Sequence, residues 1–87
     1  MRVTLNVLYR EAIYLLKNKG FETISECNEN VSIIWFFDTS DMFSSRLVIE
    51  ELNNSYRFIL LTSEKRIEKI FKCNYLANLR MFIRKEV

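Results

Sequence analysis

The apolar residues of two strand-length segments, 31–38 and 56–62, restrict what this chain can fold into more than any other feature. Successive side chains of a strand point to opposite faces of a sheet, so a half-buried strand alternates apolar and polar residues. These two segments carry apolar residues at odd and even positions alike. In the first segment Val31, Ile33, Trp35 and Phe37 share one face, and Ile34 and Phe36 lie on the other. In the second segment Tyr56, Phe58 and Leu60 share one face, and Ile59 and Leu61 lie on the other. A sheet built from such strands needs apolar cover on both faces.

Polar residues between the apolar segments predict where the chain turns. Asn-Glu-Asn at 28–30 separates segment 21–27 from segment 31–38, and Asn-Asn-Ser at 53–55 separates segment 46–52 from segment 56–62. Asn tolerates the positive φ that tight turns require. Two consecutive hairpins favour a four-stranded antiparallel meander.

Residues 4–19 are expected to form a helix that ends at the only glycine of the chain. Thr4 can cap the first turn, because its hydroxyl can accept a free backbone N–H. Gly20 can adopt the left-handed conformation of a helix C-terminus, and Phe21 can then fold back onto Leu16. The apolar stripe recurs at three- and four-residue spacing. Its members are Leu5, Leu8, Tyr9, Ala12, Ile13 and Leu16.

The segment after residue 62 is also expected to be helical. Ser63 can cap its first turn, where the Glu64 carboxylate suits the positive end of the helix dipole. The apolar stripe shifts phase near Cys73 and Asn74, which predicts one kinked helix or two short ones. The stripe comprises Ile67, Ile70, Phe71, Leu76, Leu79, Phe82 and Ile83. The expected order is therefore αββββα, an α+β fold in a single domain spanning residues 1–87.

The pattern leaves open which face of the sheet each helix covers. One helix on each face would bury all the apolar strand residues within the chain. Both helices on one face would leave an apolar patch bearing either Trp35 or the pair Ile34 and Phe36. Exposed patches of that kind are usually interfaces, so the second arrangement predicts a homodimer or another protein partner.

The net charge of +2 conceals a strongly uneven distribution. Residues 1–19 carry +3, residues 20–55 carry −6 and residues 56–87 carry +5. Such charges usually form a solvated surface that keeps a small domain soluble. The alternative is that one of these charged regions binds a partner. The basic regions could bind an acidic protein or nucleic acid, and the acidic region could bind a basic groove.

The composition excludes most catalytic chemistry. The chain has no His, which removes the commonest general base and metal ligand, and its single Gly removes any glycine-rich phosphate loop. Cys27 and Cys73 lie far apart and are expected to be reduced, partly buried thiols. We therefore expect a protein that is not an enzyme, with no cofactor and no metal. The longest apolar runs, among them residues 33–37, are too short to span a membrane. Arg10 and Glu11 interrupt the apolar residues that follow Arg2, so we expect no signal peptide, and hence a cytoplasmic protein with no membrane partner.

Four cations near the expected start of the last helix provide one alternative function. Lys65, Arg66, Lys69 and Lys72 fall within two helical turns and can share part of one surface. Together with the helix–strands–helix order, this basic start resembles a double-stranded RNA-binding domain, which implies contacts with phosphates. The chain departs from that family in an extra strand, in lacking a Pro-His loop and in lacking an Ala-rich last helix. The nucleic-acid alternative thus depends on the cations.

The leading prediction is a non-catalytic module that binds a larger protein and occludes a site on it. Eight Asn and nine Ile are typical of AT-rich coding sources such as phages and low-GC bacteria. Small phage or mobile-element inhibitors, anti-CRISPR proteins among them, share this general profile, and a nucleic-acid-processing complex is then the expected kind of partner. Aromatic side chains supply anchors and charges steer association. The expected contact residues are Trp35, Phe36, Asp38, Asp41 and Phe43.

Overall fold

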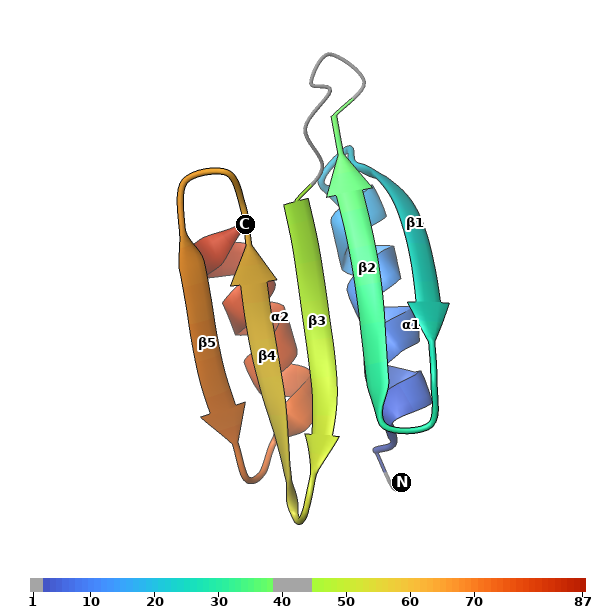
Figure 1. The fold of residues 1–87 in the computed structure, drawn as a ribbon, viewed down its shortest axis with the longest axis vertical. Helices are drawn as coiled ribbons and strands as arrows, with labels where there is room; N and C mark the ends of the chain where they lie inside the picture. Colours follow the sequence, from blue (N-terminus) through green and yellow to red (C-terminus); the bar gives the residue numbers. More distant parts are fainter. Residues whose placement is uncertain (1–2, 39–44) are drawn as a thin grey trace.

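The computed structural model describes residues 3–38 and 45–87 (Figure 1). Within these ranges the elements are α1 (Leu5–Asn18), β1 (Glu22–Cys27), β2 (Val31–Phe37), β3 (Ser45–Leu52), β4 (Ser55–Leu61), β5 (Arg66–Phe71) and α2 (Tyr75–Glu86). All strands join one antiparallel sheet in the order β1-β2-β3-β4-β5. The predicted α+β class and antiparallel meander are confirmed. The described residues form five strands, whereas the sequence predicted four.

Helix α1 begins and ends where the sequence predicts. The Thr4 side chain accepts a hydrogen bond from the backbone N–H of Val7 over 3.3 Å. At the other end Gly20 has φ +94, its N–H donates to the carbonyl of Lys17, and the N–H of Phe21 donates to the carbonyl of Leu16. These two bonds satisfy carbonyls that the helix leaves free at its end. The chain can therefore turn into β1 with almost no linker.

The fifth strand corrects the prediction for residues 63–72, which we expected to form a helix capped by Ser63. The Thr62 hydroxyl instead accepts from the backbone N–H groups of Glu64, at 3.2 Å, and Lys65, at 3.0 Å. This turn reverses the chain, so β5 pairs antiparallel with β4. Ile67 and Phe71 then pack against the core from one face of the strand, whereas Ile70 is 50% exposed on the other. Apolar residues at spacings of three and four fit a strand here as well as a helix.

The predicted phase shift at Cys73 and Asn74 marks the true start of the last helix. Asn74 has φ +52, which ends the extended backbone of β5, and its carbonyl accepts from the N–H of Asn78 in the first turn of α2. The side-chain amide of Asn78 also donates, through Nδ2, to the carbonyl of Cys73 over 3.0 Å. Neither predicted alternative, one kinked helix or two short helices, is correct. The residues before Cys73 form β5, and only those after Asn74 form a helix.

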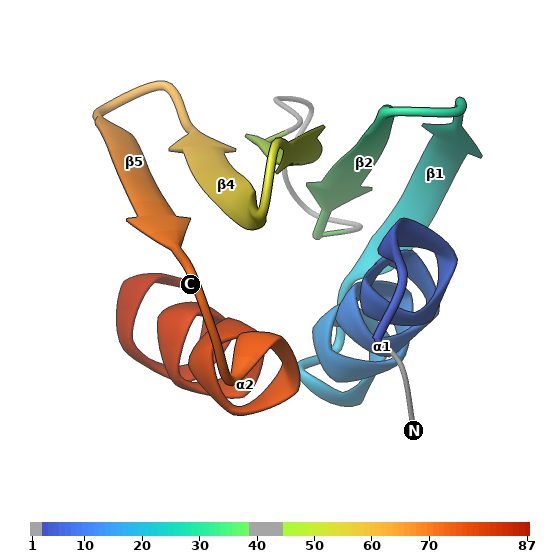
Figure 2. The ribbon, with the colours of Figure 1, turned by 90° about the horizontal axis from the view of Figure 1, so that it is seen from below.

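Both helices lie on the same face of the sheet (Figure 2). Figure 2 shows α1 beneath the β1–β2 side and α2 beneath the β4–β5 side. The core fills the layer between helices and sheet, and burying each large aliphatic side chain there contributes about 1.5–3 kcal/mol. Its fully buried members are Leu8, Ala12, Leu16, Ile34, Leu47, Ile49, Phe58, Leu60 and Leu79. Of the two helix arrangements left open by the sequence, the structure has the one that leaves a sheet face uncovered.

Candidate functional site

The uncovered side of the sheet, which we call the open face, is the leading candidate site. In β2 the residues at even positions are buried against the helices, and Ile34 is 0% exposed. The odd positions of β2 face the other way and are half-buried. Pairing carries the same alternation into the neighbouring strands, because directly opposed residues of an antiparallel pair share a face. Every strand therefore contributes side chains to a surface that no helix of the described ranges covers (Figure 2).

The centre of the open face is an apolar belt across four strands. Ile33 pairs with Val48, and Val48 pairs with Ile59, which makes one continuous apolar row. In the next row Ile24 pairs with Trp35. The apolar belt comprises Ile24, Ile33, Trp35, Val48, Ile59 and Leu61. Ile24 is 64% exposed, an unusual fraction for a large aliphatic side chain.

Charged residues surround the belt and largely neutralise one another on the β5 side. Arg57 contacts Glu50 at 2.6 Å and, through Nε, Glu68 at 3.0 Å. Arg66 completes this ion-pair chain at 3.2 Å from Glu68. The side chains of Arg57 and Glu50 are only about a third exposed, at 30% and 34%. Ion pairs that form a network contribute more than isolated surface pairs do, so these charges make an ordered polar rim beside the belt.

The five predicted contact residues fall in different places. Trp35 lies in the apolar belt, and Asp38 is exposed directly after β2. Phe36 lies on the opposite side of the same strand and is 3% exposed, with its ring edge-on to Phe21 at a centroid distance of 5.1 Å. Strand alternation therefore makes Phe36 a core residue, and we leave it out of the site. Asp41 and Phe43 lie outside the described residues.

The four cations of the nucleic-acid alternative do not share a surface, because they lie on and beside a strand. Lys65 Nζ donates to the carbonyl of Glu86 over 3.1 Å, and Lys69 Nζ lies 3.9 Å from the Glu86 carboxylate. Both therefore face the helix side. Arg66 lies on the open face in the ion-pair chain, and Lys72 follows the strand. The single basic helix surface predicted from the sequence is wrong.

Some residues of the open face escaped the sequence prediction of contacts. Ile24, Arg46 and Val48 were not singled out, although the alternation Glu22-x-Ile24-x-Glu26 already placed an apolar residue between two acids on one face of a strand. Their importance depends on the strand order, which brings β1 beside β2 and β3 to the centre of the sheet. The predicted meander already placed the first four strands in this order; it lacked the fifth strand, which makes β3 central, and the choice of the face that the helices leave open.

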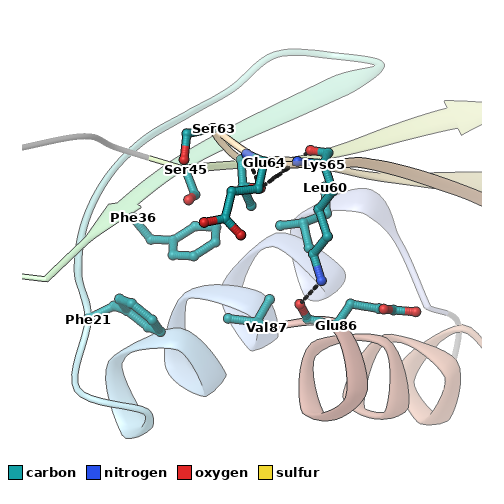
Figure 3. Close-up of a pocket in the computed structure, with 10 residues that line it drawn as sticks. Phe21, Phe36, Ser45, Leu60, Ser63, Glu64, Lys65, Glu86 and Val87 are labelled. Carbon is teal, nitrogen blue, oxygen red and sulfur yellow. Dashed lines mark hydrogen bonds between the residues drawn. The ribbon is translucent and has the colours of Figure 1, made fainter. Parts of the chain in front are cut away.

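A second candidate is a pocket of about 270 Å³ at the end of the sheet near the C-terminus (Figure 3). Figure 3 shows Phe21 and Phe36 on one side of it and the turn bearing Glu64 and Lys65 on another. The Lys65 ammonium is already bound to the carbonyl of Glu86. Its lining includes the hydroxyls of Ser45, Thr62 and Ser63 and the carboxylates of Glu64 and Glu86. The hydrogen bonds of Thr62 and Lys65 in this lining join backbone groups, and none links a hydroxyl to a side-chain base, so the pocket is the weaker candidate.

Metal and thiol chemistry find little support in residues 3–38 and 45–87. No group of three or more His, Cys, Asp or Glu side chains in these ranges could hold a metal ion. Cys27 and Cys73 are free and exposed, where partly buried thiols were expected. Desolvation raises the pKa of the Cys27 thiol, which lowers its thiolate fraction and hence its reactivity.

Comparison of the chain with models of protein families, with curated proteins and with solved structures found no match. Among the described residues, neither helix has the length and apolar character needed to cross a membrane.

Proposed function

We propose that this chain is a non-catalytic protein-binding module and that the open face is its docking surface. The observation that carries the proposal is the apolar belt, since it lies on the side of the sheet away from both helices (Figure 2). Soluble proteins rarely leave a contiguous apolar patch uncovered, and such patches with a polar rim mark interaction sites. The belt includes Trp35, and Trp is among the residue types enriched at binding hot spots.

The belt also has the anatomy of an interface. Its apolar centre would be desolvated on docking, whereas the ion-pair chain at its β5 side would remain at the rim. That the docked protein is a larger one, with a functional site that is occluded as in small phage inhibitors, stays a prediction from the sequence.

Two residues of equal exposure provide a matched test. Ile24 on the open face and Met81 on the outer side of α2 are both 64% exposed, so Lys at either position is expected to leave the fold intact. Tagged wild type, Ile24→Lys and Met81→Lys are cross-linked in cells that express the protein, and captured proteins are identified by mass spectrometry. A circular-dichroism melt confirms folding.

The expected result is a protein cross-linked by the wild type and by Met81→Lys but lost with Ile24→Lys. Loss with Met81→Lys alone would move the binding surface to the helices and overturn the assignment. A wild type that cross-links to no protein, including its own copies, would overturn the proposal as a whole.

A further inference from the structure

The central strand carries an antisymmetric charge pattern on the open face. In β3 the residues on this face include Arg46, Val48 and Glu50, spaced two apart. At about 3.4 Å per residue, the cation and the anion lie about 7 Å on either side of Val48 along the strand. Turning the strand end for end about Val48 therefore exchanges a positive position for a negative one.

Glu50 already forms an ion pair within the described ranges, whereas Arg46 does not. Glu50 accepts from Arg57 through Oε1 at 2.6 Å, and a carboxylate can accept further hydrogen bonds at its other oxygen. Arg46 is exposed and forms no ion pair with residues 3–38 or 45–87. It pairs across the sheet with Trp35 and Leu61, so an unbalanced guanidinium is set among apolar side chains. Such a guanidinium favours a partner that brings a carboxylate to it.

The rest of the open face is close to charge balance, which argues against a strongly acidic or strongly basic partner. Its cations are Arg46, Arg57 and Arg66, and its anions are Glu22, Glu26, Glu50 and Glu68. On the β5 side the ion-pair chain neutralises itself. A partner with the same near-neutral, alternating surface can bring a carboxylate to Arg46, and a second copy of this chain is such a partner.

We propose that the open face packs against the open face of a second copy, about a two-fold axis that passes Val48 and runs across the strands. Arg46 of each copy then meets Glu50 of the other, and the row Ile33–Val48–Ile59 stacks on its own equivalent. The same axis sets Glu26 against Glu26 and Glu68 against Glu68 at the two ends of this row. Both side chains are exposed toward the edges of the sheet, where solvent screens them, and Glu68 is already paired with Arg57 and Arg66. An axis along the strands would instead set Arg46 against Arg46 and Glu50 against Glu50 on the central strand, where like-charge repulsion is screened less. The inference rests on the proposed function, because it names the occupant of the docking surface.

The size of the open face suits a dimer. Five strands about 4.8 Å apart and about 20 Å long cover roughly 500 Å² in projection, and the relief of the side chains raises the accessible area further. A standard interface buries about 800 Å² per partner. A two-fold contact is also isologous and closes on itself, so it gives a dimer and not a filament.

Sedimentation equilibrium tests the dimer, with two charge-reversed variants to test its geometry. The wild type should move from monomer to twice the monomer mass with rising concentration. Arg46→Glu places a Glu against Glu50 twice in each dimer and should raise the dissociation constant at least about ten-fold. Glu50→Arg should do the same by placing an Arg against Arg46. Arg84→Glu on α2 is the matched control and should leave the constant unchanged.

Mixing Arg46→Glu with Glu50→Arg should restore association, because the mixed pair regains two Arg–Glu contacts while each variant alone has none. Failure of the mixture to restore it, when both variants melt like the wild type, would overturn the proposed axis. The emission of Trp35, the only Trp, should shift to shorter wavelength as the dimer forms; association without that shift would overturn the use of this face.

A wild type that stays monomeric at every concentration would also overturn the dimer. It would leave the proposed function standing, since cross-linking of a different protein that Ile24→Lys abolishes supports docking on this face by itself.

Discussion

Arg80 of α2 donates from Nε to Oε2 of Glu11 in α1 over 2.7 Å and so links two helices whose paired residues lie 69 positions apart. The Glu11 side chain is 22% exposed and that of Arg80 is 52% exposed, so water screens the pair on one side. The two helices lie side by side on one face of the sheet (Figure 2), and the Arg80–Glu11 ion pair joins them.

We expect Arg80→Ala or Glu11→Ala to lower the free energy of unfolding by no more than about 1 kcal/mol, because exposed ion pairs contribute little. Urea denaturation of both single variants and the double variant gives the coupling energy. Arg84→Ala, on the same helix, is the control for loss of charge alone. A coupling energy indistinguishable from zero would show that packing alone holds α1 against α2.

Gly20 provides a test of the turn between α1 and β1. Its φ of +94 is unfavourable for residues with a side chain, while a Cβ there would meet nothing within 4 Å. Gly20→Ala should therefore destabilise the protein through backbone strain alone, by about 1–2 kcal/mol. Lys19→Ala, one residue earlier at φ −86, should have little effect. Equal urea midpoints for the two variants would contradict the strain.

Local signals on single residues predicted much of the fold. Thr4 and Gly20 marked the ends of α1 because capping and positive φ depend on the residue itself. The turn at 53–54 followed in the same way, and Asn54 has φ +62. The strand at 66–71 was missed because its apolar spacing is compatible with a helix as well as with a strand. The hydroxyl of Thr62, and not that of Ser63, binds the backbone of the following turn, and this turn leads into the strand.

The candidate site was predicted only in part, because it depends on tertiary placement. Alternation correctly separated the face of Trp35 from that of Phe36. It could not say which of the two faces the helices cover, since both are apolar. The assumption of helical spacing grouped Lys65 and Arg66 on one surface. In the structure Lys65 precedes β5 and bonds to the end of α2, whereas Arg66 in β5 lies on the open face.

Two serines on neighbouring strands should respond in opposite directions to the same substitution. Ser32 is 0% exposed, and its hydroxyl has no hydrogen-bond partner in the described part of the chain. Ser25 shares a hydrogen bond of 2.7 Å with the hydroxyl of Tyr9. Ser32→Ala should raise the free energy of unfolding by up to about 1 kcal/mol, because a buried unsatisfied hydroxyl is removed. Ser25→Ala should lower it by about 1 kcal/mol, because a hydrogen bond is lost.

Thermal and urea unfolding of the two serine variants measure the difference under one set of conditions. Tyr9→Phe should reproduce the loss seen with Ser25→Ala, and combining the two should add little. A destabilised Ser32→Ala variant would contradict the prediction and show that the hydroxyl contributes through a contact such as a bound water.

The Cys27 thiol should titrate above its unfolded value. Desolvation raises its pKa, because the thiolate is the charged form, and its S–H donates to the carbonyl of Asn28 over 3.6 Å. At a given pH the folded protein then has less thiolate, so alkylation by iodoacetamide should rise with pH along a curve displaced to higher pH. The Cys73→Ser variant isolates Cys27, and the same variant unfolded in urea provides the reference curve.

Because the unfolded chain releases the Cys27 proton at a lower pH than the folded protein does, the raised pKa also predicts that the free energy of unfolding falls as the pH rises past the pKa of the unfolded thiol. Coincident alkylation curves for the folded and unfolded variant would contradict both statements.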